Sequence, residues 1–400
     1  MTYEELIQLS PNEILRFLKN NNVIYRHRKY GDFLHVLYKN IYGVLSMSNI
    51  DPIDIVKEYS NELLKYDHVE TYFNNDSFKL TDYNYMLLVN NKKIYLPEIT
   101  NIIGRGDLRG FNDIVEMNIR FKNNVECIPF GTKFPSKLEK LRLFNINKIS
   151  DRLFRRHAFL EVFESDAITI GANSFYHCDK LNIVDIPNAL YIDDEAFHFC
   201  KVLDKCNMPK VLTIKNNAFD YCYKLSYLNA YNVNTIGNKA FSNCISITEI
   251  DCPKCIDLGS GAFAHCKSIT SVNLPSLCVI NNSTFYGCYK LENINIPNVV
   301  HIESNAFDVC AALKTFIANN CISCPSAIFY KCDNLRNITM NMCKIFNIRS
   351  LPTNIDIINV PNLEVLLYDH IIDDIAELNK IKNKINSNTN YITLKYDSFY

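Results

Sequence analysis

The apolar positions of this chain repeat with a fixed period of 22 residues through its middle part. Each period contains a phenylalanine, a cysteine three residues later and an aliphatic residue three residues after that. The phenylalanines are Phe175, Phe197, Phe219, Phe241, Phe263, Phe285, Phe307 and Phe329. The cysteines are Cys178, Cys200, Cys222, Cys244, Cys266, Cys288, Cys310 and Cys332. A constant period without insertions predicts a solenoid, in which equivalent side chains of successive coils lie above one another.

Within one period, the pattern of polar and apolar positions predicts a short strand and then a turn. Leu291, Ile294 and Ile296 have the spacing L-x-x-L-x-L. Because successive side chains of a strand point to opposite sides, residues 293, 295 and 297 are expected to face outward. Ile302 begins a second inward stretch, which leads to Phe307 in the next coil.

One period resembles a known repeat closely. The nine residues from Ile236 to Cys244 read I-G-N-K-A-F-S-N-C. They resemble the core of the BspA-type leucine-rich repeat family, whose repeats carry I-G-x-x-A-F-x-x-C-x-x-L. The resemblance covers about residues 154–345 well and 91–153 loosely. It implies an α/β repeat solenoid with about eight regular 22-residue repeats, degenerate repeats before them, and a curved surface that binds other proteins or surfaces.

The segments on either side of the repeats are expected to cap the solenoid. Residues 1–90 lack the repeat, and the run from Ser10 to Glu13 has the capping hydroxyl, proline and glutamate of a helix start, so a helical N-terminal segment or cap is predicted. Residues 91–345 are predicted to form the solenoid and 346–400 a mixed C-terminal cap. That cap is expected to contain a helix from Asp369, with Ile371, Ile375, Leu378 and Ile385 near one face, and an edge strand over 391–396. We expect a monomer.

The amino-acid composition limits the class of binding partner and the cellular compartment that we expect. The 42 Lys plus Arg and 43 Asp plus Glu leave no charge excess, so no nucleic-acid partner is expected. No apolar run of about 18 residues predicts a membrane span, and the N-terminus does not have the pattern of a secretory signal. The 16 cysteines are interpreted as reduced core residues of a cytoplasmic protein, with an extracellular surface location as the alternative. Abundant Asn, Ile, Lys and Tyr are typical of an AT-rich genome, which favours a virus or a parasite as the source.

The cysteines and histidines do not predict a reactive site. Cys252-x-x-Cys255 and Cys321-x-x-Cys324 have zinc-like spacing, but the repeat register places the two pairs about three coils apart, too far to share one metal. The cysteine column is expected to be a row of packed thiols, because side chains in a ladder run parallel and do not provide disulfide torsions. The nine histidines do not cluster near a nucleophile. We therefore expect no enzyme activity, no cofactor and no metal.

The outward strand column is the candidate binding site. It is rich in Asn and Asp, and in one repeat Tyr231 replaces the usual proline. The column either forms a solvated strand face or binds a partner, with Tyr227 and Tyr231 as aromatic anchors. The candidate residues are Asp185, Lys205, Asn207, Tyr227, Asn229, Tyr231, Glu249, Asp251, Asn273 and Asn295.

The predicted function is a noncatalytic protein-interaction scaffold with a protein partner of unknown identity. Its most specific version is an intracellular host-interaction or effector protein. Two alternatives stay open: a surface adhesin exported by an unrecognised route, and an adaptor that recruits an enzyme through the N-terminal segment.

Overall fold

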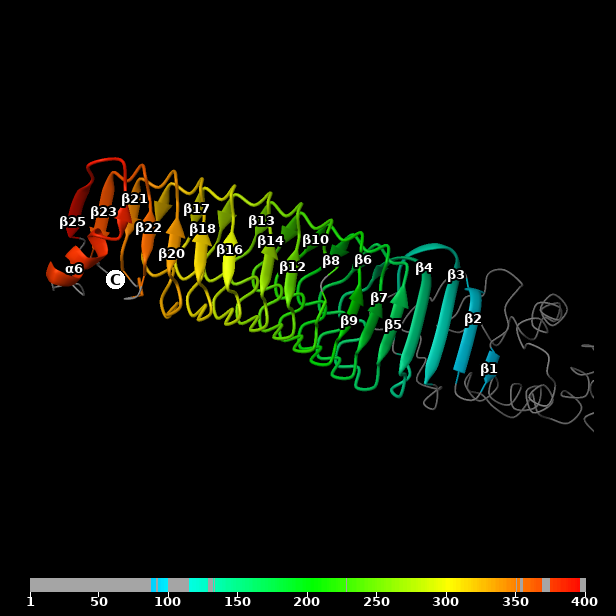
Figure 1. The fold of residues 1–400 in the computed structure, drawn as a ribbon. Coiled ribbons are helices and arrows are strands. Elements are labelled where there is room, and N and C mark those ends of the chain that lie inside the picture. The colour runs from blue at the N-terminus through cyan, green and yellow to red at the C-terminus, as the bar shows by residue number, and fades with distance from the viewer. Residues whose placement is uncertain are drawn as a thin grey trace, which may run out of the picture.

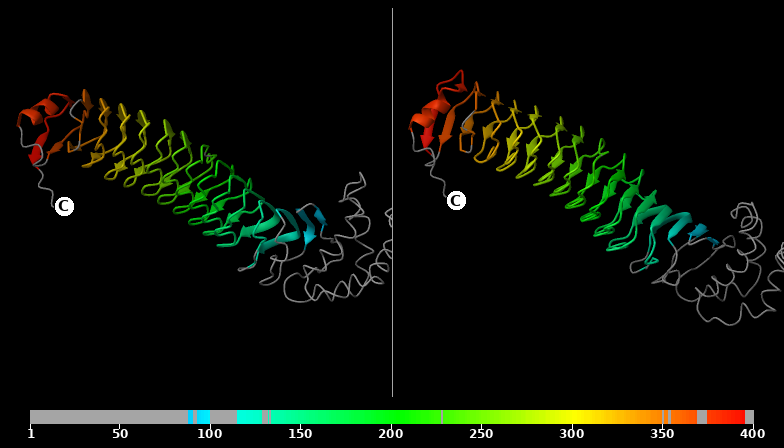
Figure 2. Two further views of the ribbon diagram at one scale, coloured as in Figure 1. Left: turned by 90° about the horizontal axis from the view of Figure 1, so that it is seen from below. Right: turned by 60° about the horizontal axis from the view of Figure 1, so that its bottom comes forward.

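The computed structural model describes residues 88–90, 93–99, 115–128, 132, 134–227, 229–349, 351–352, 355–368 and 375–395. These residues wind into coils stacked along one long axis (Figure 1). Strands of successive coils lie side by side in two rows, and in each coil the chain passes from one row to the other and back. Figure 2 shows the same elongated stack from two further directions. The predicted solenoid is confirmed.

The first row of strands follows the L-x-x-L-x-L positions. Val184 pairs with Cys206 and Ile294 with Phe316, so partners in this parallel row are one repeat apart, as predicted. The first row comprises β5 (Val162–Ser165), β7 (Ile183–Asp185), β9 (Lys205–Asn207), β12 (Glu249–Asp251), β14 (Ser271–Asn273), β16 (Asn293–Asn295), β18 (Thr315–Ile317), β20 (Asn337–Thr339), β22 (Ile357–Asn359) and β24 (Ile385–Asn386).

The second row contains shorter strands on the other side of the core. Ile192 pairs in parallel with Ile214, again one repeat on. The second row comprises β6 (Thr169–Ile170), β8 (Tyr191–Ile192), β10 (Thr213–Ile214), β11 (Thr235–Ile236), β13 (Asp257–Leu258), β15 (Val279–Ile280), β17 (His301–Ile302), β19 (Ser323–Cys324), β21 (Ile345–Asn347), β23 (Val365–Tyr368) and β25 (Ile392–Lys395). β1 (Leu88–Asn90), β2 (Lys93–Ile99), β3 (Glu116–Cys127) and β4 (Lys140–Ile149) precede both rows, and β4 pairs with β5 and with β6.

The repeated phenylalanines form a continuous stack inside the solenoid. The rings of Phe175 and Phe197 have centroids 5.1 Å apart and planes 5° apart, and the rings of Phe219 and Phe241 are 5.2 Å and 4° apart. All four side chains are fully buried. Equivalent side chains therefore lie above one another, as the period predicted.

A third side of each coil, the turn arc, leads from the second row to the repeated cysteine. Phe241 lies in one arc between Lys239, with φ 53°, and Asn243, with φ 60°. The backbone N–H groups of these three residues donate to carbonyl oxygens of the next coil at 2.8–2.9 Å. Within residues 134–349 the arcs consist of turns and not helices. The α/β class expected from the sequence is therefore wrong for this part, which is a β-solenoid, because backbone bonds between coils replace those within a helical turn.

The repeated cysteines form a buried column of free thiols. Each thiol donates to the carbonyl oxygen of the phenylalanine one coil earlier, as Cys200 Sγ does to Phe175 O at 3.1 Å and Cys244 Sγ does to Phe219 O at 3.2 Å. Burial raises the pKa of the Cys200 and Cys244 thiols well above its ordinary value, which keeps them protonated as donors. The predicted thiol column is confirmed.

The remaining cysteines agree only in part with the expected core positions. Cys252 and Cys324 are buried where the register placed them. Cys127 and Cys278 are exposed, so the interpretation of all 16 cysteines as core residues was wrong for these two.

Most of the N-terminal segment predicted from the sequence lies outside the described residues, whereas most of the predicted C-terminal cap is described. Of the expected helical segment over residues 1–90, residues 1–87 lie outside the described residues, and 88–90 form β1. At the other end both rows continue beyond residue 345 to β24 and β25. Helix α6 (Ile375–Lys382) packs Leu378 against the core, but Ile385, expected on the same helix, lies in β24. The expected edge strand is confirmed as β25. The division into three domains stays a prediction.

The described residues contain neither a candidate membrane-spanning helix nor a candidate metal site. No helix among them has both the length and the apolar composition that crossing a bilayer requires. No group of three or more His, Cys, Asp and Glu side chains in these ranges is arranged to hold a metal ion.

Candidate protein-binding face

The outward side chains of the first row from β7 to β16, together with the coil 226–231, form what we call the outer strand face. All ten candidate residues lie on it. Lys205, Tyr227, Tyr231 and Glu249 are exposed, as are Asn207, Asp251, Asn273 and Asn295, whereas Asp185 and Asn229 are half-buried. The alternation of inward and outward positions within each strand was therefore predicted correctly. Whether these residues bind a partner stays a prediction.

Adjacent coils are tied together on this face by side-chain hydrogen bonds. The Asn207 Nδ2 group donates to Asp185 Oδ1 at 2.8 Å, and the Asn273 Nδ2 group donates to Asp251 Oδ1 at 2.7 Å. Each pair stands one repeat apart on neighbouring strands. The Asn/Asp column thus stabilises the stack as well as covering it, and each such bond uses one amide donor that a partner would otherwise find free.

One coil of the outer strand face has no described strand in the first row. Strand β9 pairs only with β7 and β12 pairs only with β14, and residues 226, 227 and 229 lie between them outside any strand. Ser226 instead reaches the preceding coil through its side chain, which donates to Asp204 Oδ1 at 3.0 Å. In this coil the position that holds Pro209 and Pro253 in its neighbours holds Tyr231. Between Pro187 and Pro297, the missing strand therefore coincides with the one coil in which the proline is replaced.

Tyr227 and Tyr231 are both strongly exposed at this coil. Their exposed fractions are 68% and 54%, and Tyr227 exceeds every other large hydrophobic side chain described. The Lys254 ammonium lies 6.0 Å from the centroid of the Tyr231 ring and 2.8 Å from Asn232 Oδ1. Tyrosine contributes apolar area and a hydroxyl at low entropic cost, which is why it is enriched at interfaces.

A second row of aromatic side chains lies on the turn arcs, and the sequence reasoning missed it. The ring of Phe199 stacks on His177 with centroids 4.4 Å apart and on Tyr221 with centroids 4.5 Å apart. All three occupy the position two residues after the repeated phenylalanine. Reading that position as a column would have revealed the row. Because the rings cover each other's faces, they present mainly edges to solvent.

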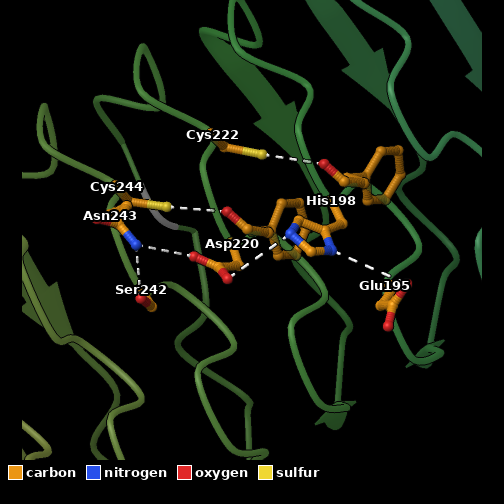
Figure 3. A network of polar contacts seen from close by, with 9 residues as sticks. Glu195, His198, Asp220, Cys222, Ser242, Asn243 and Cys244 are labelled. Carbon is orange, nitrogen blue, oxygen red and sulfur yellow. Dashed lines mark hydrogen bonds and ion pairs between the residues drawn. The ribbon is translucent and has the colours of Figure 1, made fainter.

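The same arcs hold a small cluster of polar groups (Figure 3). His198 lies between two acids, with Nε2 3.7 Å from Asp220 Oδ2 and Nδ1 3.9 Å from Glu195 Oε2. These distances exceed those of hydrogen bonds. Asp220 accepts a hydrogen bond from Asn243 Nδ2 at 3.1 Å.

The electrostatics of this cluster favour its neutral forms. Burial lowers the pKa of His198, against the opposing effect of the two acids. Burial also raises the pKa of Asp220, against the effect of the Asn243 hydrogen bond. The Cys222 and Cys244 thiols nearby point to carbonyl oxygens and not to His198 (Figure 3). Neither thiol is therefore placed for activation by His198.

Asp308, a buried acid next to Phe307 in the second-to-last turn arc, makes the stability of the chain depend on pH. Burial raises the pKa of Asp308 from 3.8 to about 6, although its Oδ1 accepts a hydrogen bond from the Tyr330 N–H at 2.9 Å. The folded chain then binds this proton more tightly than the unfolded chain, so the contribution of Asp308 to stability declines as the pH rises from about 4 through about 6. Asp308→Asn keeps an acceptor for Tyr330 and is expected to be more stable than the natural chain above about pH 7, and similar to it near pH 4.

Thermal midpoints measured by circular dichroism at both pH values would check this expectation. Asp356→Asn, at an exposed position, is the matched control and should behave like the natural chain at both. A destabilised Asp308→Asn protein near neutral pH would contradict the assignment.

The repeat geometry agrees with the sequence comparisons. The family described as BspA type Leucine rich repeat region matches in six copies, over residues 77–191, 147–267 and 256–364. These ranges cover well over half of the chain. The chain belongs to the BspA-type leucine-rich repeat family.

Solved structures with the same kind of repeat are similar to it. The leucine-rich repeat protein of T. pallidum is 18% identical, with 59% of this chain and 91% of that chain covered and a TM-score of 0.32. A leucine-rich cell surface protein of Faecalibacterium prausnitzii A2-165 is 18% identical, with 81% and 95% covered and a TM-score of 0.36. The pneumococcal vaccine antigen PcpA is 15% identical, with 80% and 99% covered and a TM-score of 0.34. No curated protein matches the sequence.

Membership in the BspA-type leucine-rich repeat family sets the general role of the fold. Such repeats are scaffolds typical of protein–protein interaction, and they are typically noncatalytic. The repeated core positions are fixed by packing, whereas outward positions can vary without loss of the coil.

Proposed function

We propose that this chain is a noncatalytic scaffold that binds another protein through the outer strand face, with Tyr227 and Tyr231 at the centre of the contact. The observation that supports this most directly is the exposure of both tyrosines at the coil between β9 and β12, where the first row lacks a described strand. Exposed aromatic side chains surrounded by polar groups are the usual centre of a protein interface.

The charges around the two tyrosines define the kind of partner. Lys205 and Glu249 are both exposed on the strands next to this coil, so the rim carries both signs. A partner with mixed charge around an apolar centre fits this rim better than a uniformly acidic or basic one. The most specific version of the proposal is an intracellular host-interaction or effector role. It is supported by the buried free thiols, which suit a reducing compartment.

Replacement of both tyrosines tests the proposed centre. The double variant Tyr227→Ala, Tyr231→Ala is expected to weaken partner binding at least about tenfold, because interface tyrosines commonly contribute more than about 1 kcal/mol each. The partner is first identified by affinity purification from the native cell, and its dissociation constant for the purified chain is then measured by biolayer interferometry.

The matched control removes two exposed tyrosine side chains from another side of the solenoid. Tyr289 and Tyr330 are exposed to 40% and 50% and lie on or next to the turn arcs, away from the outer strand face. The variant Tyr289→Ala, Tyr330→Ala should bind the partner normally. Normal binding by the first double variant, with loss of binding in the second, would move the site to the turn arcs.

A further inference from the structure

A line of lysines follows the corner where each turn arc meets the first row of strands. We call this surface the lysine corner, and it consists of the two residues after each repeated cysteine. Equivalent corner positions lie above one another, since the Ser246 hydroxyl donates to Tyr223 O of the preceding coil at 2.7 Å. In the six coils from Phe175 to Phe285, five hold one exposed lysine in the corner, namely Lys180, Lys201, Lys224, Lys267 and Lys290.

The positive charge of the lysine corner is largely uncompensated, although the whole chain has 42 Lys plus Arg and 43 Asp plus Glu. Asp179 is the one acid in these six coils of the corner, and its Oδ1 lies 3.8 Å from the Lys201 ammonium. Among the residues that the structure describes, no acid forms an ion pair with the other four lysines. Glu292, close to the corner, is paired instead with Lys314 at 2.7 Å. Cations are therefore gathered along this corner of a chain that is nearly neutral as a whole.

Aromatic rings hold two of the ammonium groups in place along the corner. Lys180 Nζ lies 4.8 Å from the ring centroid of Phe159 in the preceding coil. Lys267 Nζ lies 5.8 Å from the ring centroid of Tyr289 in the next coil. The face of an aromatic ring attracts a cation. Because these two side chains are already restrained, less side-chain entropy is lost when an anionic partner binds them.

One coil in the middle of the lysine corner has an apolar residue where its neighbours have charge. Ile245 and Ser246 occupy the corner between the coils of Lys224 and Lys267. Ile245 is 36% exposed, and Val202, also in the corner, is 38% exposed. The corner therefore presents positive charge on both sides of an apolar centre.

We propose that the lysine corner binds an acidic segment of a protein partner, extended along the long axis, with an apolar side chain over Ile245. Coils stand about 4.8 Å apart, so the line from Lys180 to Lys290 is about 24 Å long and matches about seven residues of extended peptide. Carboxylates spaced along such a segment complement the lysines and speed the encounter. The corner lies on a different side of the coil from Tyr227 and Tyr231, so this contact is additional to the outer strand face.

Two other anionic partners fit the corner less well. Single-stranded nucleic acids bind largely by stacking bases on aromatic faces. In the neighbouring aromatic row the faces of Phe199 are covered by His177 and Tyr221. An amphipathic surface binds a membrane by burying apolar side chains in it, whereas Ile245 and Val202 are mostly buried within the protein. An acidic peptide requires neither free ring faces nor protruding apolar side chains.

Fluorescence anisotropy of a labelled peptide with a Leu-Leu centre between runs of glutamate measures this binding to the full-length chain. The peptide is expected to bind, and to bind more weakly as the salt concentration rises, because salt screens exposed charges. Lys224→Gln, Lys267→Gln, Lys290→Gln, combined in one variant, should raise the dissociation constant at least about tenfold. Arginine at the same three positions keeps the charge and should preserve binding.

The matched control removes three exposed lysines from outside the corner. The combined variant Lys140→Gln, Lys210→Gln, Lys344→Gln has the same net charge as the corner variant and should bind the peptide as the natural chain does. The double variant Tyr227→Ala, Tyr231→Ala should also bind it normally, so failure of this inference is distinguishable from failure of the proposed function. Far-UV circular dichroism verifies that each variant is folded.

The outcomes that overturn the proposal are specific. They are no binding of the acidic peptide by the natural chain, unchanged binding by the folded corner variant, or equal losses in the two lysine variants, which would reflect net charge alone. Equal binding of a peptide with glutamine in place of every glutamate would also overturn it. Oligodeoxythymidylate or phosphatidylserine vesicles that bind the corner more tightly than the peptide would assign it to nucleic acid or to a membrane instead.

Discussion

Phe241→Ala is expected to lower the free energy of unfolding by about 3–5 kcal/mol. The Phe241 ring is fully buried and lies between the rings of Phe219 and Phe263, with centroids 5.2 and 5.4 Å away. Replacing the ring with a methyl group removes buried apolar surface from the core. It also leaves a cavity that the neighbouring stacked rings cannot fill. Each coil also depends on its neighbours for most of its contacts, so the loss weakens two coil interfaces at once.

Urea denaturation followed by far-UV circular dichroism measures this effect, and Phe241→Leu is the matched control. Leucine keeps most of the buried area, so it should lower the free energy of unfolding by less than alanine does. A change below about 1 kcal/mol for Phe241→Ala would mean that the phenylalanine stack adds little to the stability of the solenoid.

Gly259→Ala is expected to destabilise the chain by about 3 kcal/mol, the upper part of the usual range for overpacking. A Cβ atom at Gly259 would lie 2.4 Å from the backbone nitrogen of Asn238 and 2.4 Å from the carbonyl carbon of Gly237 in the preceding coil. Both neighbours are backbone atoms, so the coils themselves must separate to admit the methyl group. The backbone at Gly259 is not in the left-handed region, and crowding alone is the cause.

Thermal and urea denaturation of the same variant check this expectation. Lys215 occupies the equivalent position two coils earlier and already carries a side chain, whose ammonium lies 2.7 Å from Asp193 Oδ1. Lys215→Ala, the matched control, loses only a surface ion pair and should change stability by less than about 1 kcal/mol. Equal stabilities of the Gly259→Ala protein and the natural chain would show that these coils separate easily.

The sequence was sufficient to predict the parts of the fold that depend on a repeated core. Phe175, Cys178 and Leu181 recur at one interval, and stacking equivalent side chains is the simplest way to bury them all. The inward and outward sides of the first row followed from strand geometry alone. The ends were predicted less well, because there Ile385 and its neighbours have no repeat to set their register.

The backbone of the turn arcs could not be predicted from residue preferences. In each arc the residues two before and two after the phenylalanine have positive φ, and these include Glu195, Phe199 and Val309. A left-handed conformation costs such residues about 1–2 kcal/mol. Hydrogen bonds between coils offset this cost, so residues without a left-handed preference occupy many of these positions. The residues that do favour this conformation are Gly261, Gly287, Asn173, Asn217, Asn243 and Asn305. The α/β expectation failed for this reason.

The residues of the outer strand face were predicted from the sequence, but the missing strand at the coil of Tyr227 was not. Tyr227 and Tyr231 were singled out because they interrupt polar and proline columns. That the first row also lacks a described strand there depends on which backbone groups pair across two coils, and the composition of one repeat does not determine that.

The hydrogen bonds of the turn arcs give the solenoid a net dipole along its long axis. In the arcs of Phe175, Phe197, Phe219 and Phe241, alternate N–H groups point toward the following coil and the carbonyl oxygens before them point toward the preceding one. Peptide dipoles in the two rows of strands alternate and largely cancel, but those of the arcs add along the stack. The C-terminal end therefore carries partial positive charge and the N-terminal end partial negative charge. Descendants of this protein that gain or lose whole repeats would change the separation of these two poles while keeping their order.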